Sequence, residues 1–393
     1  MPETDLMQGF PASPETQVTL ANWRTTPFSR WAFHHVREIV ASADIPNDPG
    51  AVSGLLEAPG GLDRLTLDDG VSFADFLANT DTDGIVVLRR GQLVFESYAN
   101  GMDAFTPHIL MSVSKSLLGL ISGILIEDGS LDPSALVTSY VPEVAGTAYK
   151  GATVRHLLDM RAGVAFDEDY LATSGPIIEY RKAQNWNPLE PGERPSDLRS
   201  FFATMTDADG AHEGSFHYVS PNTDLLGWVI ERASGKRYAD LISEKLWRPM
   251  GAERSAYITV DRFGAPRCAG GFCATVRDLA RVGQLLVEGG RGVVPAGWID
   301  DLIAGGDAAA WAAGDFADLF GGAPMRYRSK WYVEDGAAPL LFGYGVHGQN
   351  LYVDRENEIV VAKVSSQALP VDEERNALTI RSVKAIIVAL AGG

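Results

Sequence analysis

The chain has 393 residues, of which 46% are hydrophobic and 21% are charged, as is typical of a globular protein with a sizeable core. The formal net charge of −18 argues against nucleic acid and anionic membranes as partners. Two cysteines, Cys268 and Cys273, are too few for a disulfide framework or a four-ligand zinc site. The first residues lack the apolar segment of a secretory signal, and no apolar run is long enough to span a membrane. We therefore expect a soluble cytoplasmic protein.

The predicted elements begin with an irregular arm. Residues 1–60 are rich in Pro, Ser, Thr and Asp and are expected to pack on the body of the protein. Residues 84–89 predict a buried strand, 90–91 a turn and 92–98 an alternating partner strand, which together predict a hairpin. A long apolar helix follows, which contains residues 117–126 and ends at an Asp-Gly pair.

The middle of the chain, residues 126–250, is predicted to be mainly helical. Helices are expected at 153–160 (with Thr153 as its cap), 224–233 and 238–246. The stretch 163–199 is rich in Asp, Pro, Asn and Trp and predicts a long ordered loop, and loops of that length are usually functional.

The last part of the chain returns to strands. We expect a helix at 274–288, strands at 343–354 and 358–365, and a closing helix at 374–390. Because strands come early and late, the predicted class is α/β (α+β): an antiparallel sheet flanked by helices, with a mainly helical insertion. The predicted domains are residues 61–125 with 251–393, and residues 126–250.

The pair Ser112 and Lys115 carries the strongest chemical signal. Residues three apart in a helix share a face, so the hydroxyl and the amine would meet at the start of the apolar helix. A lysine held away from water loses part of its preference for the charged form and can take the proton of a serine nucleophile. The S-x-x-K pattern is short and occurs about once by chance in a chain of this size, so a structural Ser/Lys pair is the alternative.

Two further segments could belong to the same site. Tyr218 lies on a loop just ahead of a helix, with Ser220 and Asn222 close by, where a phenol can relay a proton. Its alternative is plain packing of the loop. Residues 342–350 contain three glycines, which suit a strand edge approached closely by a substrate, or a bulged edge strand. His347 within this segment is more typical of a hydrogen-bonded structural histidine than of a base.

In this order and spacing, the segments at 112–115, 218–224 and 342–350 resemble the serine β-lactamase and penicillin-recognising superfamily. The likeness is to its class C-like branch, which includes family VIII carboxylesterases. Residues 156–160 and 270–281 are similar to further segments of that branch. From about residue 20 to the end, the chain is most similar to the nylon-oligomer (6-aminohexanoate-dimer) hydrolases, with a divergent stretch at 171–195. The resemblance implies a β-lactamase-like fold with the active site between the two domains.

The resemblance also assigns roles to residues. It implies that Ser112 is the nucleophile, Lys115 its base and Tyr218 the proton relay. Tyr170 would contact the substrate amide and Trp186 would sit on a mobile lid. The backbone N–H groups of Ser112 and Val346 would form the oxyanion hole. The remaining substrate contacts are expected from Ser220, Asn222, Ala269, Tyr344 and His347.

These residues predict a serine hydrolase that cleaves a linear amide, such as a 6-aminohexanoate oligomer, or an ester through an acyl-enzyme. The alternatives are a short-chain carboxylesterase, a β-lactamase or D-Ala-D-Ala peptidase, and an inactive peptide-binding relative. The usual Y-x-N of β-lactamases is Y-x-S at Tyr218, and no Lys-Thr-Gly is present late in the chain, which puts β-lactam recognition in doubt. No metal or cofactor is expected, and the partner is a small molecule. A homodimer is left open.

Overall fold

A computed structural model describes residues 6–67 and 70–392. Its central element is an eight-stranded sheet. The strand order is β2 (Leu56–Glu57), β4 (Gln92–Tyr98), β3 (Thr82–Arg89), β12 (Ile359–Ser365), β11 (Gln349–Asp354), β10 (Leu340–Gly345), β9 (Trp331–Glu334) and β8 (Met325–Arg328). All neighbours are antiparallel except β2 and β4. Strands from both ends of the chain therefore meet in one sheet, as predicted.

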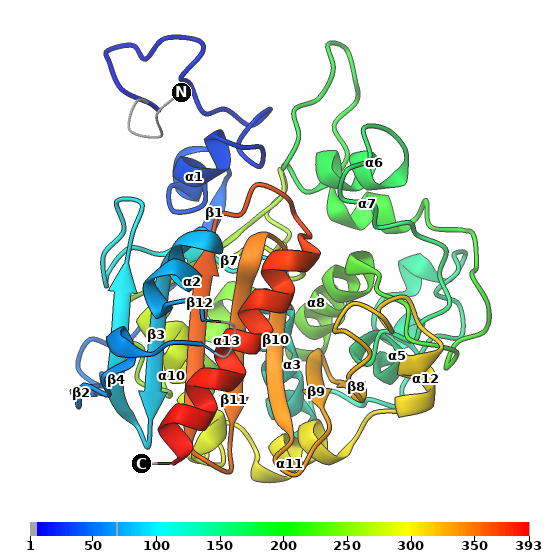
Figure 1. The fold of residues 1–393 in the computed structure, drawn as a ribbon. Coiled ribbons are helices and arrows are strands. Elements are labelled where there is room, and N and C mark those ends of the chain that lie inside the picture. Colours follow the sequence, from blue (N-terminus) through cyan, green and yellow to red (C-terminus); the bar gives the residue numbers. More distant parts are fainter. Residues whose placement is uncertain (1–5, 68–69, 393) are drawn as a thin grey trace.

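Helices cover both faces of this sheet (Figure 1). On the near face, α2 (Phe73–Asn79) and α13 (Glu373–Ala391) contact each other and pack on β3 and β12. Behind the sheet, α10 (Val276–Val287) packs on β3, β11 and β12, and α3 (Val113–Glu127) packs on β9, β10 and β11. Residues 113–125 of α3 are all buried, because this helix lies between the sheet and the helical region.

The helical region is built around α8 (Ser220–Ser234), which contacts α3. Its other neighbours are α4 (Val137–Tyr140), α5 (Val154–Leu158), α7 (Leu198–Phe202) and α9 (Tyr238–Ile242). A smaller sheet, in the order β1 (Ser42–Ile45), β6 (Ala256–Thr259), β7 (Phe272–Ala274) and β5 (His108–Ile109), ties the N-terminal arm to the body. The remaining helices are α1 (Phe28–Ala32), α6 (Pro176–Ala183), α11 (Ala296–Ala304) and α12 (Ala308–Ala312). The domain boundaries at residues 60, 125 and 250 stay a prediction.

Two segments differ from the sequence-based expectation. The predicted loop 163–199 contains the two-turn helix α6. Its Pro176 sits at the first helical position, where a missing N–H does no harm, and Ile177 and Tyr180 bury one face of the helix. The last two residues of the predicted loop, 198 and 199, belong to helix α7. The weak apolar periodicity of this polar stretch hid both helices.

The predicted strand 343–354 was wrong as a single element. It is the end of β10, one helical turn at Val346–Gly348, and then β11, which folds back so that Gly345 pairs with Gln349. His347 (φ 62°) and Gly348 (φ 86°) adopt left-handed backbone conformations that reverse the chain. A continuous run of strand-forming residues does not reveal such a reversal.

Helix α3 lies unusually close to the β8–β9 hairpin. A Cβ atom on Gly119 would come within 2.1 Å of the Ser329 carbonyl oxygen. At the same level, Ser116 Oγ donates a hydrogen bond to the Lys330 carbonyl (3.0 Å), and Trp298 Nε1 donates one to the Gly119 carbonyl (3.1 Å). The absence of a side chain at residue 119 therefore sets the distance between helix and hairpin.

We predict that Gly119→Ala lowers the free energy of unfolding by about 1–3 kcal/mol, because the helix must move away from backbone atoms that cannot yield. Urea denaturation followed by circular dichroism measures the change. Gly297→Ala is the matched control, since Gly297 is an exposed residue of helix α11 and its added Cβ meets nothing within 4 Å. An unchanged stability for Gly119→Ala would show that helix α3 is not held at this distance.

Candidate active site

Helix α3 positions the hydroxyl and the amine that the sequence singled out. Ser112 is the N-cap residue, and Lys115 lies one turn into the helix. The Nζ atom of Lys115 is 2.8 Å from Ser112 Oγ and 2.7 Å from the Ala269 carbonyl oxygen. The lysine is only 1% exposed, so these two oxygens replace the water that an amine normally binds.

Burial changes the protonation of this lysine. Removal from water disfavours the ammonium form and lowers the pKa of Lys115 from 10.5 to about 7. The carboxylates of Glu168 and Asp224 oppose this effect, and the guanidinium of Arg267 adds to it. A large fraction of Lys115 is therefore an uncharged amine near neutral pH, with a lone pair free to accept the Ser112 proton.

Tyr218 is brought to the same place from a distant part of the chain. It lies two residues before α8, and the face of its ring is 4.9 Å from Lys115 Nζ. Burial raises the pKa of the Tyr218 phenol, and a hydrogen bond with the Ser112 side chain opposes that shift. Asp315 fixes the backbone here by accepting a hydrogen bond from the Tyr218 N–H (3.0 Å). The phenol is thus protonated at neutral pH and bonded to Ser112.

The end of β10 lies directly against the start of α3. A Cβ atom on Gly345 would be 2.9 Å from the Ser112 backbone nitrogen and 3.0 Å from the Leu110 carbonyl oxygen. Gly343 is equally constrained, because its Cβ would be 2.9 Å from Ser116 Oγ. The glycines of this segment therefore allow the backbone approach that brings Val346 beside Ser112.

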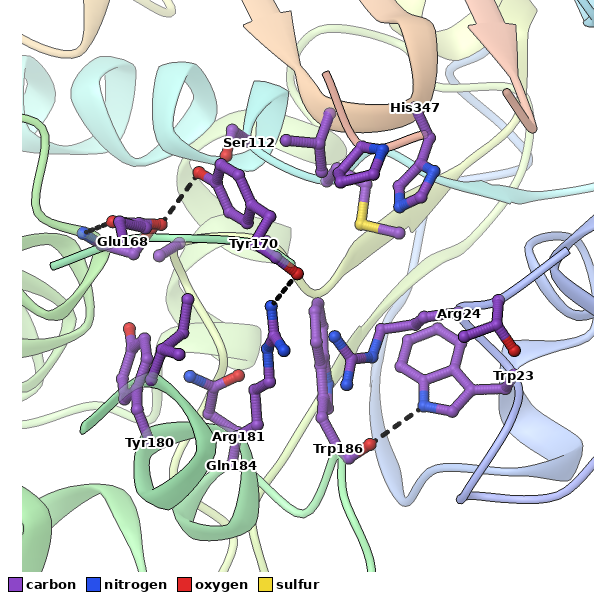
Figure 2. Close-up of a pocket in the computed structure, with 18 of the residues that line it drawn as sticks. Trp23, Arg24, Ser112, Glu168, Tyr170, Tyr180, Arg181, Gln184, Trp186 and His347 are labelled. Carbon is purple, nitrogen blue, oxygen red and sulfur yellow. Dashed lines mark hydrogen bonds between the residues drawn. The ribbon is translucent and has the colours of Figure 1, made fainter. Parts of the chain in front are cut away.

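Two cavities meet at Ser112. The smaller has a volume of about 300 Å³ and the larger about 820 Å³. Both are bounded by Ser112, Glu168, Tyr170, Leu171, Val346 and Pro370. The smaller cavity also includes Trp186, Ser220, Ala269 and His347 (Figure 2), and the larger includes Tyr218 and Tyr344. A substrate could thus extend in both directions from the nucleophile.

Glu168 is a residue of the site that sequence reasoning missed. It accepts hydrogen bonds from the Tyr170 hydroxyl (3.0 Å), from the Ser220 N–H (2.6 Å) and from the Ser220 hydroxyl. Since the Tyr170 proton points to Glu168, the lone pairs of the Tyr170 oxygen remain available as acceptors in the cavity. The acidic run around Tyr170 was the only signal in the sequence, and such runs are usually solvated surface.

Trp186 forms a firmly held wall of the smaller cavity. Its indole Nε1 donates to Thr259 Oγ1 (3.2 Å), and its carbonyl accepts from Trp23 Nε1 (3.1 Å), which belongs to the N-terminal arm. The rings of the two tryptophans lie edge to face, 5.1 Å apart. These contacts hold the Trp186 side chain in the cavity wall (Figure 2), and its place on a mobile lid stays a prediction.

The other predicted contacts have different positions. The Ala269 backbone N–H donates to Asp224 (2.8 Å), which holds the carbonyl that Lys115 binds. The Tyr344 hydroxyl accepts a hydrogen bond from Asn376 (2.7 Å). His347 Nδ1 donates to the Gln367 carbonyl (2.7 Å), and burial lowers the pKa of His347 to about 4, so its ring is neutral. Asn222 is completely buried in α8 and lines neither cavity.

The geometry agrees with the comparisons to known proteins. The Beta-lactamase family model matches residues 73–385. The chain belongs to the Beta-lactamase family. It is 36% identical over 364 residues to the 6-aminohexanoate-dimer hydrolase of Paenarthrobacter ureafaciens, covering 91% of this chain and 90% of that protein. It is also 25% identical over 190 residues to Esterase EstB of Burkholderia gladioli, covering 47% of each.

Comparison with solved structures confirms the predicted fold class. A Bacillus anthracis protein with the provisional name of 6-aminohexanoate-dimer hydrolase superposes with a TM-score of 0.85 and 26% identity, covering 96% of this chain and 97% of that one. The acyltransferase-active hydrolase EstCE1 has a TM-score of 0.61 at 16% identity, covering 81% of this chain and 98% of that one. Within residues 6–67 and 70–392, no helix has the length and hydropathy required to cross a membrane.

We predict that Lys115→Ala and Tyr218→Phe each lower turnover about a hundredfold or more, because each removes one part of a single proton path. The double variant should be about as slow as the slower single variant, since effects within one path do not add. Steady-state kinetics on one substrate gives all four rates, with Lys150→Ala as the exposed-lysine control. Losses that multiply in the double variant would assign the two residues to separate steps.

Proposed function

We propose that this member of the Beta-lactamase family is a serine hydrolase that cleaves linear amides, and esters as well, through an acyl-enzyme. The observation that carries the proposal is the 2.8 Å contact between Lys115 Nζ and Ser112 Oγ, both of which belong to buried side chains. A purely structural role of the Ser/Lys pair would not explain why two cavities meet at the Ser112 hydroxyl. The intact Ser112, Lys115 and Tyr218 set also argues against an inactive peptide-binding relative.

The reaction begins when the neutral Lys115 amine accepts the Ser112 proton as Ser112 Oγ attacks the substrate carbonyl. The new C–O bond places a negative charge on the carbonyl oxygen, which the backbone N–H groups of Ser112 and Val346 stabilise. The proton then passes through Tyr218 to the leaving nitrogen, and the C–N bond breaks. Water then attacks the carbonyl of the resulting ester while Lys115 accepts a water proton. The bond between Ser112 Oγ and the carbonyl carbon breaks, Ser112 Oγ takes the proton back from Lys115, and the acid is released.

Amide cleavage needs more than ester cleavage, because the leaving nitrogen must be protonated on its lone pair. The Tyr170 oxygen, whose own proton is held by Glu168, can accept a hydrogen bond from the substrate N–H. That bond turns the nitrogen lone pair away from Tyr170 and toward the proton donor. An ester has no such N–H, so this contact favours amides.

The substrate class is supported by the relatives. The 6-aminohexanoate-dimer hydrolase covers nearly the whole chain, which favours a linear amide. The likeness to Esterase EstB supports a short-chain carboxylesterase as the second candidate, since the same acyl-enzyme route serves an easier leaving group. β-Lactamase and D-Ala-D-Ala peptidase activities have less support, because β10 reads LLFGYG and carries no cationic side chain.

A fluorophosphonate probe tests the nucleophile directly. We expect one covalent adduct per chain, located on the peptide that contains Ser112, because this serine both contacts a buried amine and lines the two cavities, whereas Ser365 beside buried Lys363 lines neither of them. Intact-mass and peptide mass spectrometry measure the adduct. Ser112→Ala should lose labelling and turnover while keeping its thermal midpoint, and Ser130→Ala, at an exposed serine, should keep both. Undiminished turnover in Ser112→Ala would refute the mechanism.

We predict that Tyr170→Phe lowers amide turnover about tenfold or more and changes ester turnover much less, because only the amide loses a hydrogen bond in the transition state. The measurement compares kcat/KM for an amide and an ester that share one acyl group. Tyr140→Phe, at a tyrosine on α4 outside both cavities, serves as the control. Equal losses on both substrates would remove Tyr170 from the amide-specific role.

A further inference from the structure

The smaller cavity has a cationic wall that the mechanism does not use. Arg24 comes from the N-terminal arm, Arg181 from helix α6 and Arg267 from the segment after β6, and all three line this cavity. Figure 2 shows Arg24 and Arg181 on either side of the Trp186 ring. Three separate parts of the chain thus place guanidinium groups around one small space, away from Ser112.

Only one of these three charges is neutralised inside the protein. Arg267 forms an ion pair with Asp224, with 2.5 Å between nitrogen and oxygen. Arg181 donates instead to the Tyr170 carbonyl (2.9 Å), and Arg24 donates to the Asn187 side-chain oxygen (2.5 Å). In the described part of the chain, neither Arg24 nor Arg181 has a carboxylate within ion-pair distance. Neither of these two guanidinium groups is therefore directly paired with an anion, and Glu168, which also lines this cavity, only partly offsets the burial that lowers the pKa of Arg181.

The surroundings of Arg24 make that arrangement unfavourable without a ligand. Its pKa falls from 12.5 to about 9, mainly because the guanidinium is buried and further because Arg181 and Arg267 repel it. Burial and the two neighbouring guanidinium groups therefore both disfavour the charged form of Arg24. An anion bound beside Arg24 would offset both effects.

A buried amide supplies a second, independent sign of a ligand. Gln184 lines the same cavity. It is the C-cap residue of α6, three residues after Arg181, and therefore lies toward the same side of that helix. It is 1% exposed, and neither its Nε2 nor its Oε1 has a hydrogen-bond partner. The Nε atoms of Arg24 and Arg267 also lack partners. Buried donors are nearly always satisfied, so several unsatisfied donors around one cavity indicate a missing acceptor.

The larger cavity has the opposite charge. Besides Glu168, which lines both cavities, its walls include the carboxylates of Asp169, Asp315, Asp318, Glu373 and Glu374. The nucleophile therefore lies between a cationic cavity and an acidic one. A substrate with a charged end would be oriented by this difference before it reached Ser112.

We propose that the arginine pocket, formed by Arg24, Arg181 and Gln184 beside Trp186, binds a carboxylate at the far end of the substrate's acyl chain. The proposal rests on the proposed function and deepens it. The substrate class is then the half-amide, or half-ester, of a dicarboxylic acid. Arginine suits this task because its planar donors match the two oxygens of a carboxylate.

The assignment to the acyl side follows from the position of the proton donor. Tyr218, which hands the proton to the leaving nitrogen, lines the larger cavity and not the smaller. The leaving amine must therefore depart on the larger, acidic side. The acyl chain, bonded to Ser112, extends the other way into the arginine pocket. An acyl chain that ends in an ammonium, such as 6-aminohexanoyl, would bring a further cation to Arg24 and Arg181.

Three p-nitroanilides test the pocket, since they share one leaving group and differ only at the end of the acyl chain: adipoyl (carboxylate), hexanoyl (neutral) and 6-aminohexanoyl (ammonium). We expect kcat/KM for adipoyl to exceed that for hexanoyl about tenfold or more, and 6-aminohexanoyl to be the slowest. Arg181→Glu should reverse the order of the two charged substrates. A purely structural role of Arg181 would slow all three alike. Arg194→Glu, at an exposed arginine of the same segment, should leave the order unchanged.

The outcomes separate this inference from the proposed function. Equal rates for adipoyl and hexanoyl, or an unreversed order in Arg181→Glu, would overturn the arginine pocket while leaving the hydrolase intact. A carboxylate preference seen only when the carboxylate is on the leaving amine, as in N-hexanoyl-6-aminohexanoate, would overturn the acyl-side assignment. If no substrate is cleaved and no serine is labelled, the proposed function fails. In that case, calorimetry still tests the arginine pocket by measuring adipate binding to Ser112→Ala. No binding, or equal binding by the Ser112→Ala/Arg181→Glu double variant, would refute the pocket.

Discussion

The site depends on the removal of water from one amine. Lys115 is held in a helix that is buried along most of its length. Among residues 6–67 and 70–392, its Nζ atom has only Ser112 Oγ and the Ala269 carbonyl as polar neighbours at hydrogen-bond distance. Removal from water disfavours the charged ammonium form of Lys115 and favours the neutral amine, whose lone pair can accept a proton. The same burial that builds the core of the protein thus prepares the base, because an exposed lysine would remain protonated and could not activate a serine near neutral pH.

A single carboxylate organises the surroundings of that amine. Asp224, on α8, accepts the Ala269 N–H (2.8 Å) and so orients the carbonyl that binds Lys115. It also pairs with Arg267 on the wall of the smaller cavity. Helix α8 therefore connects the catalytic group with the substrate-facing wall, and Arg267 balances the charge of Asp224.

The sequence predicted the parts of the site that are local. Ser112 and Lys115 share a helix turn, so their contact follows from spacing, and the β3–β4 hairpin follows from a turn at Arg90 and Gly91. The reversal at His347 could not be predicted, because left-handed residues leave no apolar pattern. The cationic wall was missed for another reason. Arg24 and Arg181 meet only after the arm and α6 have packed, and each alone resembles an ordinary surface arginine.

The measurement closest to the central claim is the pH dependence of Ser112 labelling by a fluorophosphonate. Since the neutral amine is the base, the labelling rate should be lost as the pH falls below about 7, the pKa of buried Lys115, and should level off above it. In Lys115→Ala, labelling should be slow and the step near pH 7 absent. A rate that is constant across this range, or that rises only toward 10.5, the ordinary pKa of lysine, would contradict the account.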